Sequence, residues 1–301
     1  MLSAEYDDDT ALAELARRCD VVTIEVEHVP VESLAWLAER VPVRPSPEAV
    51  AVTQDRRAEK EALAAAGVAT APWASPPRAF PNGTVLKRRR GGFDGRGQVM
   101  LAPGEPVDGA LDGPCISEEV VAFERELSIV AARGVDGRVA CYPVVENRHA
   151  EGILRTTIAP APGLTASMQA EAEGIAGAVL ERLGYVGVLA VELFAVEGRL
   201  VANEVAPRVH NSGHWTMDGA ATGQFEQHLR AIAGLPLGST SARAPVAMVN
   251  LLGSLPDLGA LLAVPGAHVH VYGKAPRPAR KLGHVTVPLG ELASVERIIA
   301  G

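Results

Sequence analysis

Hydrophobic and polar residues alternate along the N-terminal part of the chain in patterns typical of helices and buried strands. Residues 7–18 have apolar positions at helical spacing after an acidic first turn, which suits the helix dipole. The β-branched run 21–26 predicts a buried parallel strand. An amphipathic helix over 31–40 and a brief strand over 41–43 follow. Because a parallel sheet needs more strands than these, we expect the first domain to be incomplete.

The rest of the chain combines strand and helix patterns. Helical spacing predicts one long helix over 48–66, closed by Gly67 just after its C-cap. From residue 84 to about 206, short apolar runs separated by turn residues predict strands, with one helix over 166–183. This mixture is typical of α+β architecture. A helix is also expected over 224–233, strands over 246–252, 268–272 and 284–287, and a last helix at the C-terminus.

Composition and charge exclude several classes of protein. The chain has 301 residues, enough for about two to three structural units, and its formal net charge of −8 argues against wholesale nucleic-acid binding. No apolar run is long enough to cross a bilayer, and the acidic N-terminus is not a signal peptide. Because Cys19, Cys115 and Cys141 lack metal-ligand spacing, we expect reduced thiols in a cytoplasmic protein.

A basic, glycine-rich segment from Lys87 to Gln98 carries the most informative signal. It reads KRRRGGFDGRGQ, and the strand pattern before it places Lys87 at a strand end. Glycines let backbone N–H groups approach phosphate oxygens, and the lysine adds a positive charge. A solvated basic turn and an RGG-like nucleic-acid segment are the alternatives, although the latter normally occurs in disordered sequence. The spacing favours phosphate binding.

A pair of glutamates is expected to face each other across a hairpin. Residues 187–196 and 200–205 read as antiparallel strands. If the hairpin is centred on Gly198, Glu192 and Glu204 lie opposite each other with Cβ atoms about 4.5–5.5 Å apart. Two glutamates on a solvated face are the alternative, but the flanking residues are apolar. A buried carboxylate pair requires a cation, and oxygen ligands favour Mg²⁺.

Two polar loops add candidate binding groups. The first, 206–216, follows the second glutamate strand and contains Arg208, His210 and Asn211. Single polar residues are common in surface loops, but this combination beside a carboxylate pair favours a site for an anion or a reaction intermediate. The second loop is either a solvated basic turn or a phosphate clamp. Its basic residues are Lys274, Arg277, Arg280 and Lys281.

Together these segments resemble the 5-(carboxyamino)imidazole ribonucleotide synthetase family of the ATP-grasp superfamily. The resemblance extends from about residue 21 to about residue 287. Its motifs are EVEHVP at 25–30, QDR at 54–56, the glycine-rich segment 87–98, FERELS at 123–128, YP at 142–143, ENRH at 146–149, GILR at 152–155, YVGV at 185–188, the stretch 203–216, QFEQHLR at 224–230, GK at 273–274, RK at 280–281 and GH at 283–284.

The resemblance implies a fold and a reaction. Two α+β subdomains of an ATP-grasp domain hold ATP between them, after a Rossmann-like N-terminal domain and before a small β-rich C-terminal domain. The corresponding ranges are 1–47 for a truncated N-terminal domain, 48–237 for the ATP-grasp domain and 244–301 for the C-terminal domain. The implied reaction is ATP-dependent carboxylation of 5-aminoimidazole ribonucleotide with bicarbonate in purine synthesis, through carboxyphosphate. A homodimer is implied as well, with no nucleic acid or membrane as partner.

Family positions also imply a role for each matching residue. Mg²⁺ is expected on Glu192 and Glu204. The bicarbonate-derived anion is expected at Arg208, His210 and Asn211, and the ribonucleotide at Glu27, Asp94, Arg96, Lys274 and Arg280. ATP is expected at Arg56, Lys87, Gly92, Phe93, Asp94, Gly95, Arg96, Gly97, Gln98, Glu118, Glu119, Val120, Val121, Glu126, His149, Asn203 and Glu204.

Two departures from the family pattern lead to further expectations. Phe93 stands where the family usually has tyrosine, so stacking is kept and a hydroxyl contact is lost. The family's opening strand and glycine-rich turn have no match, so we expect nucleotide binding to be retained better than ribonucleotide binding. The alternatives are another ATP-grasp ligase of purine synthesis and a catalytically impaired nucleotide-binding remnant.

Overall fold

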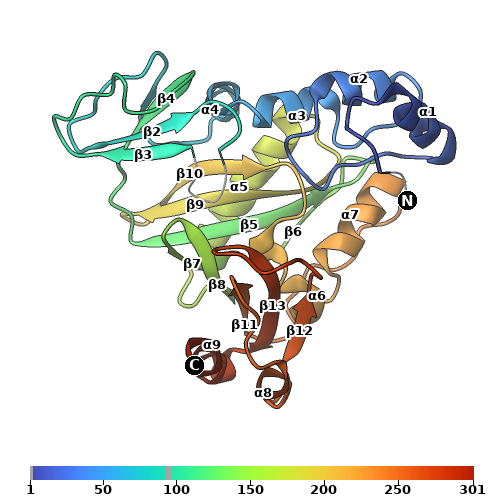
Figure 1. Cartoon of the computed structure of the whole chain (residues 1–301), viewed down its shortest axis with the longest axis vertical. Coiled ribbons are helices and arrows are strands. Elements are labelled where there is room, and N and C mark those ends of the chain that lie inside the picture. The colour runs from blue at the N-terminus through green and yellow to red at the C-terminus, as the bar shows by residue number, and fades with distance from the viewer. Residues whose placement is uncertain (1–2, 93–96) are drawn as a thin grey trace.

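The computed structural model describes residues 3–92 and 97–301 and begins with a helical region (Figure 1). Its helices pack around a small apolar core that includes Leu34, Leu37 and Val50. The predicted strand over 21–26 is wrong, because only Val22 finds a partner, in an isolated parallel bridge to Val43. The helices of this region are α1 (Asp9–Arg18), α2 (Val31–Ala38) and α3 (Pro47–Thr53).

The single helix predicted over 48–66 is also wrong, because the chain breaks it into α3 and α4 (Arg56–Ala65). The Asp55 side chain accepts a hydrogen bond from the backbone N–H of Arg57 and so caps a new helix. The amide of Gln54 donates to the carbonyls of Glu27 and Val29, which ties the break to the preceding loop. As a result, α4 has an orientation of its own above the large sheet (Figure 1).

A four-stranded antiparallel sheet follows α4, with the strand order β1-β4-β2-β3. Lys87 is the penultimate residue of β2 and pairs with Gln98 on β3 and with Ile116 on β4. The predicted position of this lysine at a strand end is confirmed. The strands are β1 (Trp73–Ala74), β2 (Thr84–Arg88), β3 (Gln98–Leu101) and β4 (Cys115–Glu119).

The larger sheet has the strand order β10-β9-β5-β7-β8-β11-β13-β12, with β6 paired to β5. Alternate residues of β5 and β9 face α5 in one core and the loops around Trp215 in a second core. Burial on both faces is consistent with the almost wholly apolar sequence of β9 and with the apolar run 129–132 in β5. The elements are β5 (Arg125–Arg133), β6 (Val139–Cys141), β7 (Val145–Ala150), β8 (Ile153–Ala159), α5 (Ala166–Arg182), β9 (Gly187–Val196) and β10 (Arg199–Ala206).

The C-terminal part extends this sheet, because β11 pairs with β8 through the register partners Val246 and Ala159. The predicted helix over 224–233 is confirmed, and Gly234 ends it at φ 71°. The remaining elements are a 3₁₀ turn (Asn211–Gly213), α6 (Thr216–Gly219), α7 (Gln224–Ala233), β11 (Val246–Leu252), α8 (Leu258–Leu262), β12 (His268–Val271), β13 (Lys281–Pro288), a 3₁₀ turn (Leu289–Glu291) and α9 (Leu292–Ala300).

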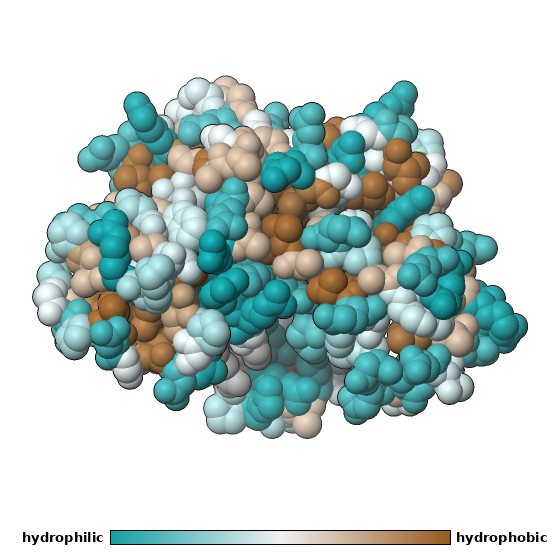
Figure 2. All heavy atoms as spheres, turned by 90° about the horizontal axis from the view of Figure 1, so that it is seen from above, coloured by the Kyte–Doolittle hydropathy of each residue, from teal (hydrophilic) through white to brown (hydrophobic). Residues whose placement is uncertain are grey.

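The molecular surface mixes polar and apolar groups. Figure 2 shows hydrophobic residues in small groups between hydrophilic ones on the face seen from above. In the part of the chain that the structure describes, no helix is both long enough and apolar enough to cross a membrane.

Candidate active site

The carboxylate pair predicted from the sequence lies on the hairpin of β9 and β10, where Glu192 and Glu204 are register partners. The turn is tight: Glu197 and Gly198 both have positive φ, 49° and 75°, as a two-residue type I′ turn requires. This turn alone would pair Glu192 with Asn203. A bulge at Asn203 shifts the register by one residue. The predicted pairing therefore arises from a short turn and a bulge, and not from a hairpin centred on Gly198.

The two carboxylates lie in different electrostatic environments. Burial, and then the neighbouring charge of Glu204, raise the pKa of Glu192. Burial acts on Glu204 in the same direction, but Arg56 and Lys87 outweigh it and hold the pKa of Glu204 well below its usual range. Arg56 donates to Glu204 over 2.8 Å. Two facing oxygen donors, one of them reluctant to ionise, fit a divalent cation that prefers oxygen ligands.

Lys87 reaches the same cluster from the small sheet. Its ammonium lies 3.0 Å from Glu118 and donates to the side-chain oxygen of Asn203 over 3.2 Å. A second lysine, Lys60 on α4, lies 3.1 Å from the other oxygen of Glu118. Although burial would raise the pKa of Glu118, the two lysines lower it. Two cations around one buried carboxylate leave a net positive charge where a phosphate group would bind.

Lys60 and its neighbour Glu59 were not among the residues expected from the sequence. Both belong to α4 and are buried, with 1% and 4% of their surface exposed. Burial raises the pKa of Glu59 to about 8, against the opposing effect of Arg56. A usable signal was present, because Arg56, Glu59 and Lys60 have the i, i+3, i+4 spacing that places residues on one helix face.

The polar loop after β10 contributes Arg208 and His210. Arg208 pairs with Glu27 over 2.9 Å, and the Nε2 atom of His210 lies 3.3 Å from Glu192. Burial, followed by the charge of Arg208, lowers the pKa of His210 to about 3, so this imidazole is neutral at pH 7. The amide of Asn211 exchanges hydrogen bonds of 2.7 and 3.0 Å with that of Asn250. The structure thus brings Glu27, Arg208 and His210 to the carboxylate pair.

A buried chain of hydrogen bonds fixes the orientation of His210. Thr157 donates to the side-chain oxygen of Asn147 (2.9 Å), whose amide donates to Ser128 (2.9 Å), which donates to Ser212 (2.8 Å). The backbone N–H of Ser212 donates to Nδ1 of His210, and the Ser212 hydroxyl lies 2.8 Å from the same atom. Nδ1 is therefore the acceptor, and the neutral ring carries its proton on Nε2, facing Glu192.

Other positions expected to contact ATP line the neighbouring strands. Glu126 on β5 pairs with His149 on β7, and this carboxylate raises the pKa of His149 against the effect of burial. At the end of β4, the backbone N–H of Glu119 donates to the carbonyl of Pro72, and the N–H of Val120 donates to the carbonyl of Gly83. These two N–H groups are therefore already engaged within the protein.

The glycine-rich segment and the basic loop are placed less completely. Gly97 has φ +69° and its carbonyl accepts from Arg88 over 2.8 Å. Phe93, Asp94, Gly95 and Arg96 lie outside the described residues, so their expected contacts have no structural counterpart here. The ammonium of Lys274 lies 5.3 Å from the Tyr272 ring centre, and Arg280 donates to Ala275. Within 3–92 and 97–301, neither Lys274 nor Arg280 contacts the carboxylate cluster.

A second group of potential metal ligands is Asp218, His270 and His284. His270 lies 2.9 Å from Asp218, and the hydroxyl of Tyr272 lies 2.6 Å from Nδ1 of His284. However, the rings of His270 and His284 stack at 4.6 Å with planes 17° apart. The nitrogen lone pairs of an imidazole lie in the plane of the ring. Because the two planes are stacked and nearly parallel, the lone pairs do not converge on one ion. The group is an imidazole stack, continued by His214 at 5.0 Å from His284.

Facing carboxylates on a β-hairpin, with one lysine from a smaller sheet and another from a neighbouring helix, are the arrangement expected of an ATP-grasp protein. Family models agree with this class: an ATP-grasp domain matches residues 68–225, a ribonucleotide synthetase preATP-grasp domain matches 1–54, and a phosphoribosylaminoimidazole carboxylase C-terminal domain matches 246–297. The predicted combination of a pre-ATP-grasp region, an ATP-grasp domain and a small β-rich C-terminal domain is confirmed.

Individual relatives define the family more closely. The N5-carboxyaminoimidazole ribonucleotide synthase of Pseudomonas aeruginosa is 44% identical, over 99% of this chain and 86% of the relative. The crystal structure of the N5-carboxyaminoimidazole ribonucleotide synthetase from Thermus thermophilus has a TM-score of 0.89 and 46% identity, covering 99% of this chain and 84% of that one. The chain therefore belongs to the N5-carboxyaminoimidazole ribonucleotide synthase family.

A further solved structure carries bound ligands. It is the N5-carboxyaminoimidazole synthase of Aspergillus clavatus in complex with ADP and 5-aminoimidazole ribonucleotide. Its TM-score is 0.89 at 30% identity, and the match covers 99% of this chain and 85% of that chain. The similarity thus extends over nearly the whole chain to a protein that binds both a nucleotide and a ribonucleotide.

Proposed function

We propose that this chain carboxylates 5-aminoimidazole ribonucleotide with bicarbonate, using ATP and releasing ADP and phosphate. The observation that carries the proposal is the facing pair Glu192 and Glu204 between Arg56, Lys87 and the polar loop. Similarity over nearly the whole chain to a complex with ADP and 5-aminoimidazole ribonucleotide supports the same substrates.

ATP phosphates are proposed to bind between the small sheet and the hairpin. Lys87 and Arg56 are the cations there, and both are held by carboxylates, at 3.0 Å from Glu118 and at 2.8 Å from Glu204. Such fixed charges lower the cost of accumulating negative charge in phosphoryl transfer. The proposed ATP contacts among the described residues are Arg56, Lys87, Gly92, Gly97, Gln98, Glu118, Glu119, Val120, Val121, Glu126, His149, Asn203 and Glu204.

Mg²⁺ is proposed to be held by Glu192 and Glu204. Their facing oxygens fit its preference, and the proposal is supported by the pKa of Glu192, which burial and the charge of Glu204 raise. A bound magnesium ion supplies neutralisation of phosphate charge. The protein contributes the fixed separation of the carboxylates and, through Arg56, the ionised state of Glu204.

The bicarbonate-derived anion is proposed to bind at Arg208, His210 and Asn211. Arg208 brings a permanent charge, and neutral His210 offers the Nε2–H that its hydrogen-bond chain fixes. Glu27, which pairs with Arg208, is proposed to contact the ribonucleotide. We also propose ribonucleotide contacts from Asp94, Arg96, Lys274 and Arg280, which rest on the family resemblance.

The test is phosphate release measured with each substrate omitted in turn. We expect rapid release only when ATP, bicarbonate and 5-aminoimidazole ribonucleotide are all present, with a carboxylated product that is lost on acidification. Phosphate release that needs a different acceptor, or that proceeds without bicarbonate, would identify another ATP-grasp ligase. Binding of ATP without any release would identify a nucleotide-binding remnant.

Magnesium binding by the glutamate pair is tested with Glu204→Gln. Removing one of two facing carboxylates relieves their repulsion, so we expect a cooperative fold of similar stability but little activity. Wild-type protein with ADP should gain thermal stability when MgCl₂ is added, because a ligand bound only to the native state stabilises it. The glutamine variant should lose most of this gain. A full magnesium-induced shift in the variant would place the metal elsewhere.

The oligomeric state, the cellular location and the domain boundaries complete the proposal. We propose a homodimer, which rests on the family resemblance and is tested by light scattering. The cytoplasmic location is supported by the free state of Cys19, Cys115 and Cys141. The boundaries 1–47, 48–237 and 244–301 are proposed for the three domains.

A further inference from the structure

The bulge at Asn203 decides whether the two glutamates face each other. From Arg199 to Ala202, strand β10 pairs with β9 in one register, and from Glu204 onward the register is shifted by one. Without the shift, Glu204 would pair with Val191. Paired residues share a face of the sheet, and Val191 is packed in the core under α5. The bulge therefore moves Glu204 from the core face to the face of Glu192.

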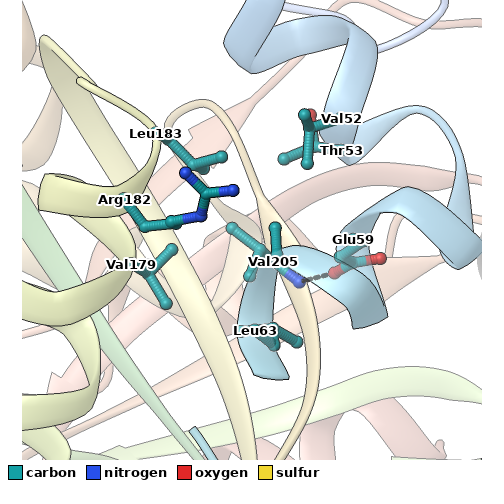
Figure 3. Close-up of a pocket in the computed structure, with 9 residues that line it drawn as sticks. Val52, Thr53, Glu59, Leu63, Val179, Arg182, Leu183 and Val205 are labelled. Carbon is teal, nitrogen blue, oxygen red and sulfur yellow. Dashed lines mark hydrogen bonds between the residues drawn. The ribbon is translucent and has the colours of Figure 1, made fainter. Parts of the chain in front are cut away.

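A bulge interrupts the ladder of backbone hydrogen bonds, so the groups around it need other partners. Two consecutive residues of α4 supply them. Lys60 donates to the backbone carbonyl of Asn203 over 2.9 Å, and a carboxylate oxygen of Glu59 accepts from the backbone N–H of Val205. Figure 3 shows Glu59 reaching from its helix to this N–H. One helical turn earlier, Arg56 pairs with the side chain of Glu204.

We propose that Glu59 and Lys60 are positioning residues that hold the bulge and thereby set the geometry of the metal-binding carboxylates. The proposal rests on the function proposed above, because it takes Glu192 and Glu204 as the metal ligands. The hydrogen bonds of Glu59 and Lys60 to β10 are made to the backbone on either side of Glu204 and not to its side chain. Both are buried, so water does not readily replace them as partners.

The two residues differ in how cleanly they report on the bulge. Lys60 also pairs with Glu118 at 3.1 Å, so its removal changes the phosphate site as well. Glu59 bonds to the backbone of Val205, and its variants isolate the effect on β10. Glutamine keeps an acceptor oxygen at nearly the same position, whereas methionine keeps the length and loses the acceptor. Comparing Glu59→Gln with Glu59→Met therefore separates the hydrogen bond from charge and size.

The measured quantity is the dissociation constant of Mn²⁺, used as a paramagnetic probe for the magnesium site, in the presence of saturating ADP. Removal of a residue that orients a metal ligand typically weakens metal binding about 10- to 100-fold. We expect Glu59→Met and Lys60→Met to show such a loss, and Glu59→Gln to remain close to wild type. The matched control is Arg57→Met, which removes an exposed partner of Glu61 on the same helix.

Two additional measurements separate the possible failures. Affinity for ADP without metal should be the same in Glu59→Met and Glu59→Gln, since both lose the same ionisable group beside Arg56 and only the methionine variant alters the carboxylate geometry. Equal Mn²⁺ affinities in Glu59→Gln and Glu59→Met would overturn the positioning role. If Glu59→Met does not fold, Glu59→Asp takes its place, because its side chain is one methylene too short to reach Val205. Wild-type Mn²⁺ affinity in Glu59→Asp would then overturn the positioning role. Wild-type affinity in Glu204→Gln would instead overturn the metal assignment, and the positioning role with it.

Discussion

At the scale of single residues, Lys87 is the clearest candidate for a direct role in turnover. It lies between Glu118 and Asn203, at the end of a strand next to the glycine-rich segment. Replacing it with methionine keeps the length of the side chain and removes the charge that would face ATP phosphate. We expect Lys87→Met to lose at least about 100-fold in kcat while still melting cooperatively. The control is Arg138→Met, at an exposed turn; near-normal turnover in folded Lys87→Met would contradict the assignment.

The hydrogen-bond chain behind His210 leads to a second prediction. Ser128 is its middle member, accepting from Asn147 and donating to Ser212. Ser128→Ala interrupts the chain, so the His210 ring is less firmly held in the form with its proton on Nε2. We expect kcat to fall about tenfold or more, with little change in the KM for ATP.

The spectroscopic control for this prediction is the ¹⁵N chemical shift of the His210 ring, which reports its tautomer directly. We expect a mixed tautomer in Ser128→Ala and a single one in Ser167→Ala, where an exposed hydroxyl on α5 is removed. A single unchanged tautomer together with normal turnover in Ser128→Ala would show that the chain has no such role.

Single residues also show what could be predicted from the sequence. The facing of Glu192 and Glu204 was predicted correctly, but from a hairpin centred on Gly198; it arises from a two-residue turn and a bulge at Asn203 that strand alternation does not reveal. Glu59 and Lys60 were missed, because charged residues in a helix are usually solvated. Their contacts come from strands that are distant in sequence, β10 for both residues and β4 for Lys60. Tertiary contacts of this kind leave little trace in a local pattern.

At the scale of elements, the errors come from breaks and unpaired runs. The helical pattern continues through Gln54 and Asp55, and the periodicity hides the break between α3 and α4. Aspartate is a preferred N-cap, so Asp55 was a readable sign of a new helix. The β-branched run at 21–26 forms no strand, because a strand exists only where a neighbour pairs with it, and Val22 alone is paired, with Val43.

Helix α7 supplies a prediction about acid stability. His228 accepts the backbone N–H of Val188 at Nδ1 and lies 2.8 Å from the hydroxyl of Thr23, which joins three distant segments. Burial lowers its pKa to about 4, below the value of about 6.5 in an unfolded chain. The folded state therefore binds this proton less readily. The stabilising contribution of neutral His228 to the free energy of unfolding is complete above pH 6.5 and is lost as the pH falls from 6.5 towards 4.

The loss amounts to as much as about 3 kcal/mol for this one group. His228→Gln retains an acceptor and a donor but does not titrate in this range. We expect urea unfolding of wild type to lose more free energy between pH 7 and pH 4.5 than unfolding of the variant. Other buried histidines titrate in both proteins and cancel in this comparison. Identical pH profiles would mean that His228 does not stay neutral in the fold.

At the scale of the whole molecule, the larger sheet runs without a break from β10 to β12. Strand β11 pairs with β8 on one side and β13 on the other, so the C-terminal strands and the hairpin of the carboxylates share one sheet (Figure 1). The second core lies on both sides of this junction, with Val246 and Met248 packed near Trp215. The connection over 238–244 is thus not the only link between the two parts.

Cutting the chain in this connection tests the continuity of the sheet. A protease site inserted at 238–241 allows a single cut between α7 and β11. We expect the two pieces to co-elute in gel filtration and to melt in one transition, because the β8–β11 ladder and the apolar core hold them together. Separation of the C-terminal piece under native conditions would show that the junction contributes little.

The one-residue bulge at Asn203 also limits how this segment can change over evolutionary time. Substitutions between the turn and Glu204 alter side chains but keep the count of residues. Gain of a single codon there, with the bulge unchanged, would carry Glu204 one position further along β10, opposite Val191 and into the core. Loss of a codon would instead remove the bulge and leave Glu204 opposite Glu192 in an uninterrupted ladder. A lineage with the added codon would keep a plausible strand and lose the facing carboxylates. Selection must therefore act more strongly against insertions than against deletions between residues 197 and 204.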